Sequence, residues 1–123
     1  MKTIFVVDDN SVNLLMVEEA LSDYYDVITM SSVSTMFELF NNIIPDLILL
    51  DIMMPDINGF DALEQLKANI KYEKIPVIFL TSKIDPNTEA LGVKMGVADF
   101  IKKPFSEPLI LNSIKRVLGP DSI

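Results

Sequence analysis

The chain lacks cysteine and histidine altogether, and each absence excludes a class of site. Without cysteine there is neither a disulfide framework nor a thiolate metal site. Without histidine there is no Ser-His-Asp catalysis, no histidine-ligated zinc and no self-phosphorylation on histidine. Any chemistry must therefore come from carboxylates, hydroxyls, amides and amines.

Positive charge is also scarce, since 10 Lys and Arg stand against 18 Asp and Glu and give a net charge of -8. Contacts with phosphate groups need clustered cations, so we expect no direct binding of nucleic acid by this chain and no binding to a membrane of anionic lipid. The opening MKTIFVVDDN has too short an apolar run for a secretory signal, and the longest apolar runs are far shorter than a membrane span. A cytoplasmic location is the expectation.

Hydrophobic residues, by contrast, make up 50% of the 123 residues, which is enough for one domain over residues 1–123 with its own core. Short apolar, β-branched runs alternate with segments of helical period, a pattern typical of repeated βα units and a parallel sheet. The expected strands are Ile4–Val7, Val27–Met30, Leu47–Leu50, Val77–Leu80 and Asp99–Lys102.

Apolar residues recur at helical spacing between these strands and after the last one. Four sets of apolar residues at this spacing predict one helix each, in chain order, and the last helix lies near the C-terminus. The sets are Leu14, Val17 and Leu21; Met36, Leu39, Phe40 and Ile43; Leu63, Leu66 and Ile70; Ile110, Ile114, Val117 and Leu118. A further helix, roughly Asn87–Met95, has the weakest pattern and glycines near its end. We expect it to be the most mobile element.

Polar side chains follow four of the expected strands at the points where the strands end. In an open parallel sheet such ends share one edge, where ligand groups collect, so we expect these side chains to converge. They are Asp8 and Asp9 after the first strand, Asp51 after the third, Thr81 and Ser82 after the fourth, and Lys102, Lys103 and Pro104 at the end of the fifth.

Three acids in one cleft need a cation, because two carboxylates ~4 Å apart repel by about 4 kcal/mol at an effective dielectric constant of 20. A set of ligands made only of oxygen suits Mg²⁺ or Mn²⁺ rather than zinc. In a phosphoryl site, metal and lysine neutralise the phosphoryl oxygens, a hydroxyl donates a hydrogen bond and one carboxylate attacks in line. The placement of acids, a hydroxyl group and a lysine at one edge of the sheet therefore predicts a site of phosphoryl transfer.

Simpler interpretations exist for each residue taken alone. Paired acids after a strand are most often helix caps, Lys-Pro is usually a loop, and Thr81 can satisfy backbone groups at a strand end. The stretch DINGFD does not fit the calcium-binding loop of an EF-hand, since Met54 and Gln65 would stand at loop positions that require carboxylates. The sequence also has no glycine-rich phosphate loop or dinucleotide-binding motif.

The stretches FVVDDN, DLILLDIMMPDINGFDAL, IPVIFLTS and ADFIKKPF, in this order and spacing, resemble the receiver domain of bacterial two-component response regulators over essentially the whole chain. The resemblance implies an α/β, flavodoxin-like fold: a doubly wound, five-stranded parallel sheet of order 2-1-3-4-5 with five flanking helices. It also implies a phosphoacceptor that phosphorylates and dephosphorylates itself but is no metabolic enzyme. The donor would be a phosphohistidine on a histidine kinase or phosphotransfer protein.

The same resemblance implies a role for each residue of the site. Asp51 is the phosphoacceptor. Mg²⁺ (or Mn²⁺) is bound directly by Asp9, Asp51 and the backbone carbonyl of Met53, while Asp8 acts mainly through water. Lys103 pairs with the phosphoryl group and precedes a cis bond to Pro104.

Switching and tuning residues are implied as well. Thr81 moves towards the phosphoryl group and Phe100 swings inward, which changes the surface of the fourth helix, fifth strand and fifth helix and so controls a partner or output domain. Phe100 stands where many members have Tyr, so a switch based on a hydroxyl is absent; plain core packing of the ring is the alternative. Met53 and Lys83 flank the path of the attacking water, and the apolar Met53 predicts a long-lived aspartyl phosphate.

Other functions stay open at this point. The chain is alternatively the regulatory part of a larger enzyme or of a hybrid histidine kinase, or a flavodoxin-like cofactor binder, since a fold does not define a function. A homodimer through the fourth helix, fifth strand and fifth helix is compatible with the charges there, and so is a plain solvated face. These charges are Lys94, Asp99, Lys102, Lys115 and Arg116.

Overall fold

The computed structural model describes residues 1–122, which form a five-stranded, wholly parallel sheet of order β2-β1-β3-β4-β5. Every predicted strand is present and agrees with the prediction to within one residue at each end. The strands are β1 (Thr3–Val7), β2 (Asp26–Met30), β3 (Leu47–Asp51), β4 (Val77–Thr81) and β5 (Asp99–Lys102).

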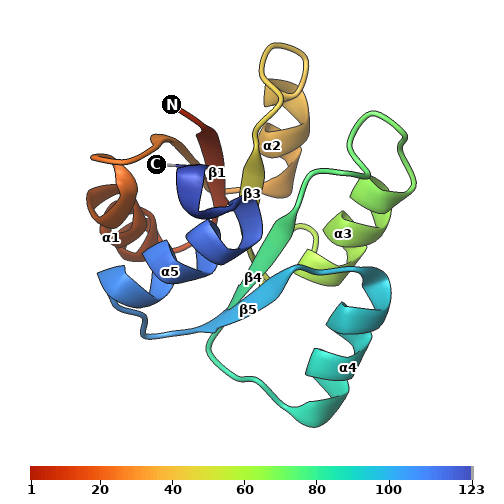
Figure 1. Ribbon diagram of the computed structural model, residues 1–123. Helices are drawn as coiled ribbons and strands as arrows, with labels where there is room; N and C mark the ends of the chain where they lie inside the picture. The colour runs from red at the N-terminus through yellow and green to blue at the C-terminus, as the bar shows by residue number, and fades with distance from the viewer. Residues whose placement is uncertain (123) are drawn as a thin grey trace.

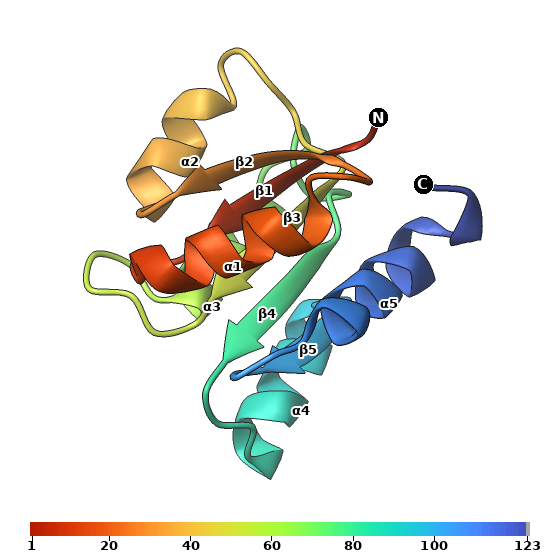
Figure 2. The ribbon, with the colours of Figure 1, turned by 90° about the vertical axis from the view of Figure 1, so that its left-hand side faces the viewer.

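Helices cover both faces of the sheet, as Figures 1 and 2 show: α1 and α5 pack on one face, and α2, α3 and α4 lie on the other. The flavodoxin-like, doubly wound fold is therefore confirmed. The helices are α1 (Ser11–Leu21), α2 (Val33–Leu39), α3 (Gly59–Lys67), α4 (Pro86–Met95) and α5 (Glu107–Leu118), followed by a short 3-10 helix η1 (Pro120–Ser122). Among the described residues, none of the helices combines the length and the apolar character needed to cross a bilayer.

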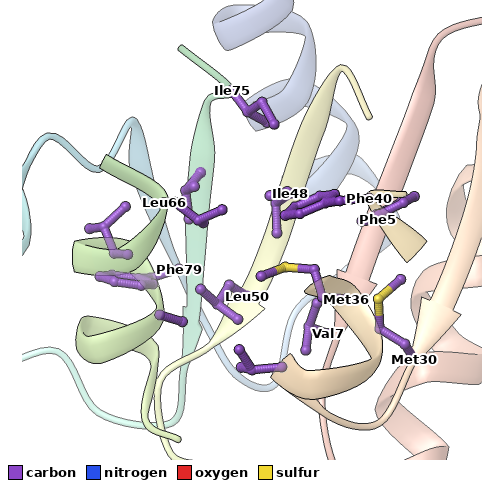
Figure 3. Close-up of a cluster of buried hydrophobic side chains, with 14 of the residues drawn as sticks. Phe5, Val7, Met30, Met36, Phe40, Ile48, Leu50, Leu66, Ile75 and Phe79 are labelled. Atoms are coloured by element: carbon purple, nitrogen blue, oxygen red, sulfur yellow. The ribbon is translucent and has the colours of Figure 1, made fainter. Parts of the chain in front are cut away.

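The middle of the sheet is apolar on both sides. All residues of β3 and β4 are buried, which explains why their sequences read as unbroken hydrophobic runs rather than as alternating ones. Figure 3 shows the core on the side of α2 and α3, where Phe5 stacks on Phe40 at a centroid distance of 5.8 Å. Polar groups at the ends of such strands are held by a rigid, well-packed support.

Two predicted helix positions are wrong. Ile43 and Ile70 were placed on the apolar stripes of helices, but α2 ends at Leu39 and α3 ends at Lys67. Both isoleucines lie in the loops beyond, and Ile70 is 84% exposed. Local hydrogen bonding explains the second case, since the Asn69 side chain accepts from the Lys71 backbone N–H at 2.9 Å and begins a turn.

Helix α4 matches its predicted range closely but is held weakly. Its N-cap is Asp85, whose side chain accepts from the Thr88 backbone N–H, and its C-cap is Gly96 in the left-handed region at φ 92. Gly92 is its only buried residue. This weak packing agrees with the low amphipathicity of the sequence, and the greater mobility of the helix stays a prediction.

Candidate functional site

The carboxyl ends of β1, β3, β4 and β5 bring the predicted polar residues to one edge of the sheet. In the sheet order β3 lies between β1 and β4, so Asp51 stands at the centre of this edge. Strand pairing places Asp51 beside Leu80 and Thr81 beside Lys102. The expected convergence is therefore present.

Lys103 joins the two buried acids of the edge. Its Nζ lies 2.8 Å from Oδ2 of Asp8 and 3.3 Å from Oδ1 of Asp51. The Lys103 backbone N–H donates to the carbonyl oxygen of Thr81 at 2.7 Å, which fixes the start of the following loop, and the bond to Pro104 is cis. One ammonium group thus serves two buried carboxylates.

Asp8 is fully buried and has a partner for each carboxylate oxygen. Oδ1 accepts from the backbone N–H of Asn10 at 2.9 Å, and Oδ2 accepts from the side-chain amide of Asn13 at 3.3 Å as well as contacting Lys103. Asn10 also caps α1 by accepting from two backbone N–H groups of the first turn. Sequence reasoning missed Asn13; the only signal is a second amide side chain three residues after Asn10.

Asp51 is 5% exposed, and its environment disfavours ionisation. Burial, and then the neighbouring carboxylate of Asp8, raise the pKa of Asp51 to about 6, while Lys103 and the Met53 backbone N–H lower it. That N–H donates to Oδ1 of Asp51 at 3.3 Å. Asp51 is consequently ionised at neutral pH but held at an electrostatic cost that a bound cation can relieve.

The loop after Asp51 returns closely past its own strand, and this requires a glycine. The Gly59 backbone N–H donates to the carbonyl oxygen of Ile52 at 2.7 Å. A Cβ on Gly59 would lie 2.8 Å from the Cα of Ile52 and 3.0 Å from the carbonyl oxygen of Asp51. The glycine therefore allows α3 to begin against the strand end that carries Asp51.

The three predicted acidic ligands meet here. One carboxylate oxygen each from Asp8, Asp9 and Asp51 lies within 4.8 Å of the others, with Asp9 exposed and the other two buried. Such a set of hard oxygen donors fits Mg²⁺ or Mn²⁺. Because Asp9 is exposed, this side of the cluster is open to solvent.

Thr81 is placed differently from Lys103. Its hydroxyl donates to the carbonyl oxygen of Lys83 at 2.8 Å and accepts from the Lys83 backbone N–H at 3.2 Å, so it serves its own loop. Beside it lies a cavity of about 390 Å³ that also includes both predicted tuning residues. The lining residues are Ile52, Met53, Asn58, Phe60, Thr81, Ser82, Lys83, Asp85 and Thr88.

Phe100 is partly buried against the core and does not line this cavity. Its ring centroid is 5.8 Å from that of Phe79, and a Cβ on Gly92 of α4 would lie 2.4 Å from its Cζ. The ring therefore occupies a socket that exists only because residue 92 is glycine. Of the charges predicted for a dimer face, Asp99 is bonded within its own chain, to Ser113 at 2.6 Å and to Arg116.

Comparison with known proteins identifies the family of this chain. The model of the response regulator receiver domain matches residues 4–115. A probable cyclic di-GMP phosphodiesterase of Vibrio cholerae is 38% identical over 112 residues, which are 91% of this chain but 25% of that protein. This chain is thus similar to about a quarter of that relative.

Two solved structures have the same fold as this chain. The chemotaxis protein CheY4 of Vibrio cholerae superposes with a TM-score of 0.90 at 27% identity, over 96% of this chain and 99% of that one. The non-phosphorylated HemR receiver domain of Leptospira biflexa gives a TM-score of 0.85 at 31% identity, over 96% of this chain and 94% of that one. The chain belongs to the receiver domain family of response regulators, a family of signalling rather than metabolic proteins.

Proposed function

We propose that this chain is a phosphoacceptor in which Asp51 takes a phosphoryl group from a phosphohistidine of a histidine kinase or phosphotransfer protein. The observation that carries the proposal is the position of Lys103 between Asp8 and Asp51, 2.8 and 3.3 Å from their oxygens. A buried carboxylate beside an ammonium group, at the edge where acids converge, is the arrangement that in-line phosphoryl transfer needs. The donor comes from another protein because the chain has no histidine.

In the proposed step, a carboxylate oxygen of Asp51 attacks the phosphorus atom and forms the new P–O bond as the P–N bond breaks. The bonding electron pair leaves with the imidazole nitrogen, which then takes a proton from solvent. Although burial raises the pKa of Asp51 to about 6, this value is still below neutral pH, so the nucleophile is ionised. Lys103 moves its ammonium group from the carboxylates to the incoming phosphoryl oxygens, where the negative charge is concentrated.

Asp8, Asp9, Asp51 and the backbone carbonyl of Met53 would hold Mg²⁺ (or Mn²⁺). When bound, the ion supplies positive charge beside the phosphoryl oxygens during transfer. Asp8 is already satisfied by Asn10 and Asn13, so we assign it mainly to orienting water. Asp9, which is exposed, is free to bind the ion directly.

Donor access is favoured by the surface next to the site. Helix α1 begins just after the two acids and exposes three apolar side chains in its first two turns: Val12, Leu15 and Met16, which are 62%, 55% and 42% exposed. An apolar face beside the nucleophile fits a partner that must place its phosphohistidine at Asp51. We propose that the donor packs on this face.

The readout proposed for the phosphorylated state is a change of α4, β5 and α5. Thr81 would exchange its bond to Lys83 for one to the phosphoryl group, which frees the space beside it for Phe100. Met53 and Lys83 line the same cavity and would control the access of water to the phosphoryl group. The homodimer through this surface also stays a proposal.

The chain spans about a quarter of the Vibrio phosphodiesterase that it matches. This favours a regulatory role for the domain within a longer protein, and the gene's reading frame beyond Ile123 tests it. The assignment to the receiver family favours the phosphoacceptor over the predicted alternative of a flavodoxin-like cofactor binder.

The direct test is incubation with acetyl phosphate and Mg²⁺, followed by intact-mass measurement. We expect the mass of one phosphoryl group to be added to the wild type and to an Asp26→Asn control at the start of β2, and none to Asp51→Asn. EDTA should prevent the reaction. An unmodified wild type, or a modified Asp51→Asn variant, would refute the proposal.

A further inference from the structure

The surface between α3 and α4 has a groove that the phosphoryl site does not use. Its volume is about 400 Å³, and it is lined by Glu64 and Lys67 of α3 and by Leu91, Lys94 and Met95 of α4. The two helices lie side by side on the same face of the sheet (Figure 1). The volume is enough to take in side chains of a partner, rather than merely offering a flat surface.

The floor of the groove is apolar and incompletely covered. Leu91 is 45% exposed although it faces α3, and Met95 is only partly buried against the core. Helix α4 buries Gly92 alone, and two of its apolar side chains, Leu91 and Val93, stay 45% and 65% exposed. Exposed apolar surface in a hollow between two helices is typical of a docking site.

The rim of the groove is cationic, and one of its lysines is held in place. Lys67 Nζ donates to the carbonyl oxygen of Glu73 at 3.0 Å, and Lys67 Cε lies 3.4 Å from the position of a Cβ on Gly96. The Lys67 side chain therefore crosses from the end of α3 to the end of α4. Lys94, in the last turn of α4, is exposed on the same groove.

This concentration of positive charge contrasts with the chain as a whole. Lys71 and Lys74 follow α3 directly and are exposed, so the end of α3, the next loop and the end of α4 hold four of the 10 basic residues. The chain as a whole has a net charge of -8, which repels acidic molecules. This groove is where an acidic partner meets cations and apolar surface together.

We propose that the groove between α3 and α4 binds an acidic amphipathic helix of a protein partner. Apolar side chains of that helix would cover Leu91 and Met95, and its carboxylates would pair with Lys67 and Lys94. Glu64 lines the groove one turn before Lys67 on α3. Its carboxylate would repel an acidic residue of the partner at that end of the groove and so set the direction of the bound helix. Nucleic acid and anionic lipid are disfavoured by the net charge, and an extended peptide would find no sheet edge between two helices.

The inference depends on α3 and α4 alone and not on phosphorylation of Asp51, so either proposal can fail without the other. The probes are two stapled helical peptides of about 18 residues with the same leucine stripe, one flanked by glutamates and its twin by lysines. Binding to the full chain is measured by fluorescence anisotropy at low ionic strength. Chemical-shift changes of ¹⁵N-labelled protein locate the bound peptide.

We expect the glutamate peptide to bind with a Kd on the order of 100 µM and the lysine twin at least about tenfold more weakly. The double variant Lys67→Glu with Lys94→Glu, and separately Leu91→Asp, should each weaken binding of the glutamate peptide about tenfold. Lys115→Glu, which makes one such charge reversal on α5, should leave it within about twofold. Circular dichroism melts verify that the variants fold.

Four outcomes would overturn the inference. Equal binding of both peptides would show that charge does not select the partner. Shift changes confined to α1 or α5, or an unchanged Kd in the groove variants, would place the site elsewhere. Self-association of the chain that the groove variants abolish, seen by sedimentation, would make a second copy the occupant instead.

Discussion

Strand β5 separates two regions that are built in opposite ways. On one side, α5 packs Ile110 and Ile114 into the core, and its Ser113 and Arg116 bind Asp99 of β5. On the other side, α4 buries only Gly92 and has a hollow along each flank, one towards α3 and one towards β5. We call these regions the α5 seam and the α4 side.

The difference shows where this fold keeps its adaptable surface. Helix α4 contributes Gly92 and the partly buried Met95, whereas α5 contributes Ile110 and Ile114 to one of the two core clusters, so displacing α4 should expose less apolar area. The α4 side also contains the cavity lined by Thr81, Lys83 and Met53 next to the nucleophile. A change at Asp51 therefore meets the weakly packed side first, and low local stability is what a moving element requires.

The largest expected effect comes from truncating matched apolar residues on the two helices. Ile114 is fully buried, so Ile114→Ala should lower the free energy of unfolding by about 3 kcal/mol. Leu91 is 45% exposed, so Leu91→Ala should cost less than about 1 kcal/mol. Urea titration measures the free energy of unfolding of both variants, and equal losses would contradict the difference in packing between α5 and α4.

The next effect concerns Asp51, whose raised pKa means that the folded chain holds a proton more strongly than the unfolded chain. Folding stability should therefore fall as the pH rises from the ordinary value of 3.8 through about 6. Asp51→Asn cannot titrate, so at pH 8 in EDTA it should be more stable than the wild type by about 2 to 3 kcal/mol. Urea titrations across this pH range measure the difference in stability between the variant and the wild type. A difference that does not change with pH would contradict the raised pKa of Asp51 as its cause.

Asp99 in the α5 seam should behave in the opposite way. Burial opposes its ionisation, but hydrogen bonds from Ser113, the Phe100 backbone N–H and Arg116 keep its pKa below the usual 3.8. Its contribution to stability is thus complete above pH 3.8 and is lost as the pH falls through the folded-state pKa. Asp99→Asn should cost about 1.5 kcal/mol at pH 7 and progressively less in acid, as measured by thermal melts.

The smallest effect sharpens the comparison at the contact between α4 and β5. Gly92→Ala gains about 1 kcal/mol in helix propensity but places a methyl group against Phe100, so a net loss of about 1 kcal/mol is expected. In a Phe100→Leu background the clash is relieved, and the same substitution should become neutral or stabilising. A double-mutant cycle by urea titration measures the coupling, and additivity of the two changes would show that the socket has no energetic role.

The strands and the convergence of the site were predictable because both depend on local pattern and on parallel topology. A strand buried on both faces must be a continuous apolar run, as in β3 and β4, and parallel strands bring their carboxyl ends to one edge. Asp8, Asp51 and Lys103 therefore follow from the order of residues along the chain. Their roles in transfer remain predictions that the experiment with acetyl phosphate tests.

Other features were not predictable because they depend on individual side-chain contacts that the pattern of apolar residues does not encode. The apolar pattern continued to Ile70, but a side-chain hydrogen bond at Asn69 ended the helical segment in a turn. Asn13 contributes to the site only because α1 begins beside Asp8. The fit of Phe100 against Gly92 joins two elements whose separation no local pattern encodes.

The sequence by itself determined the fold class, the polar groups at each strand end and the kind of chemistry they support, since these follow from periodicity and from the acids, lysine and hydroxyl present. Only the tertiary structure decided how these groups share charge. It placed one ammonium group between Asp8 and Asp51, raised the pKa of Asp51 by burial, bonded Thr81 to Lys83 and left α4 held chiefly at Gly92. Distances and burial are collective properties of the packed chain, and these properties set the energy of each charge.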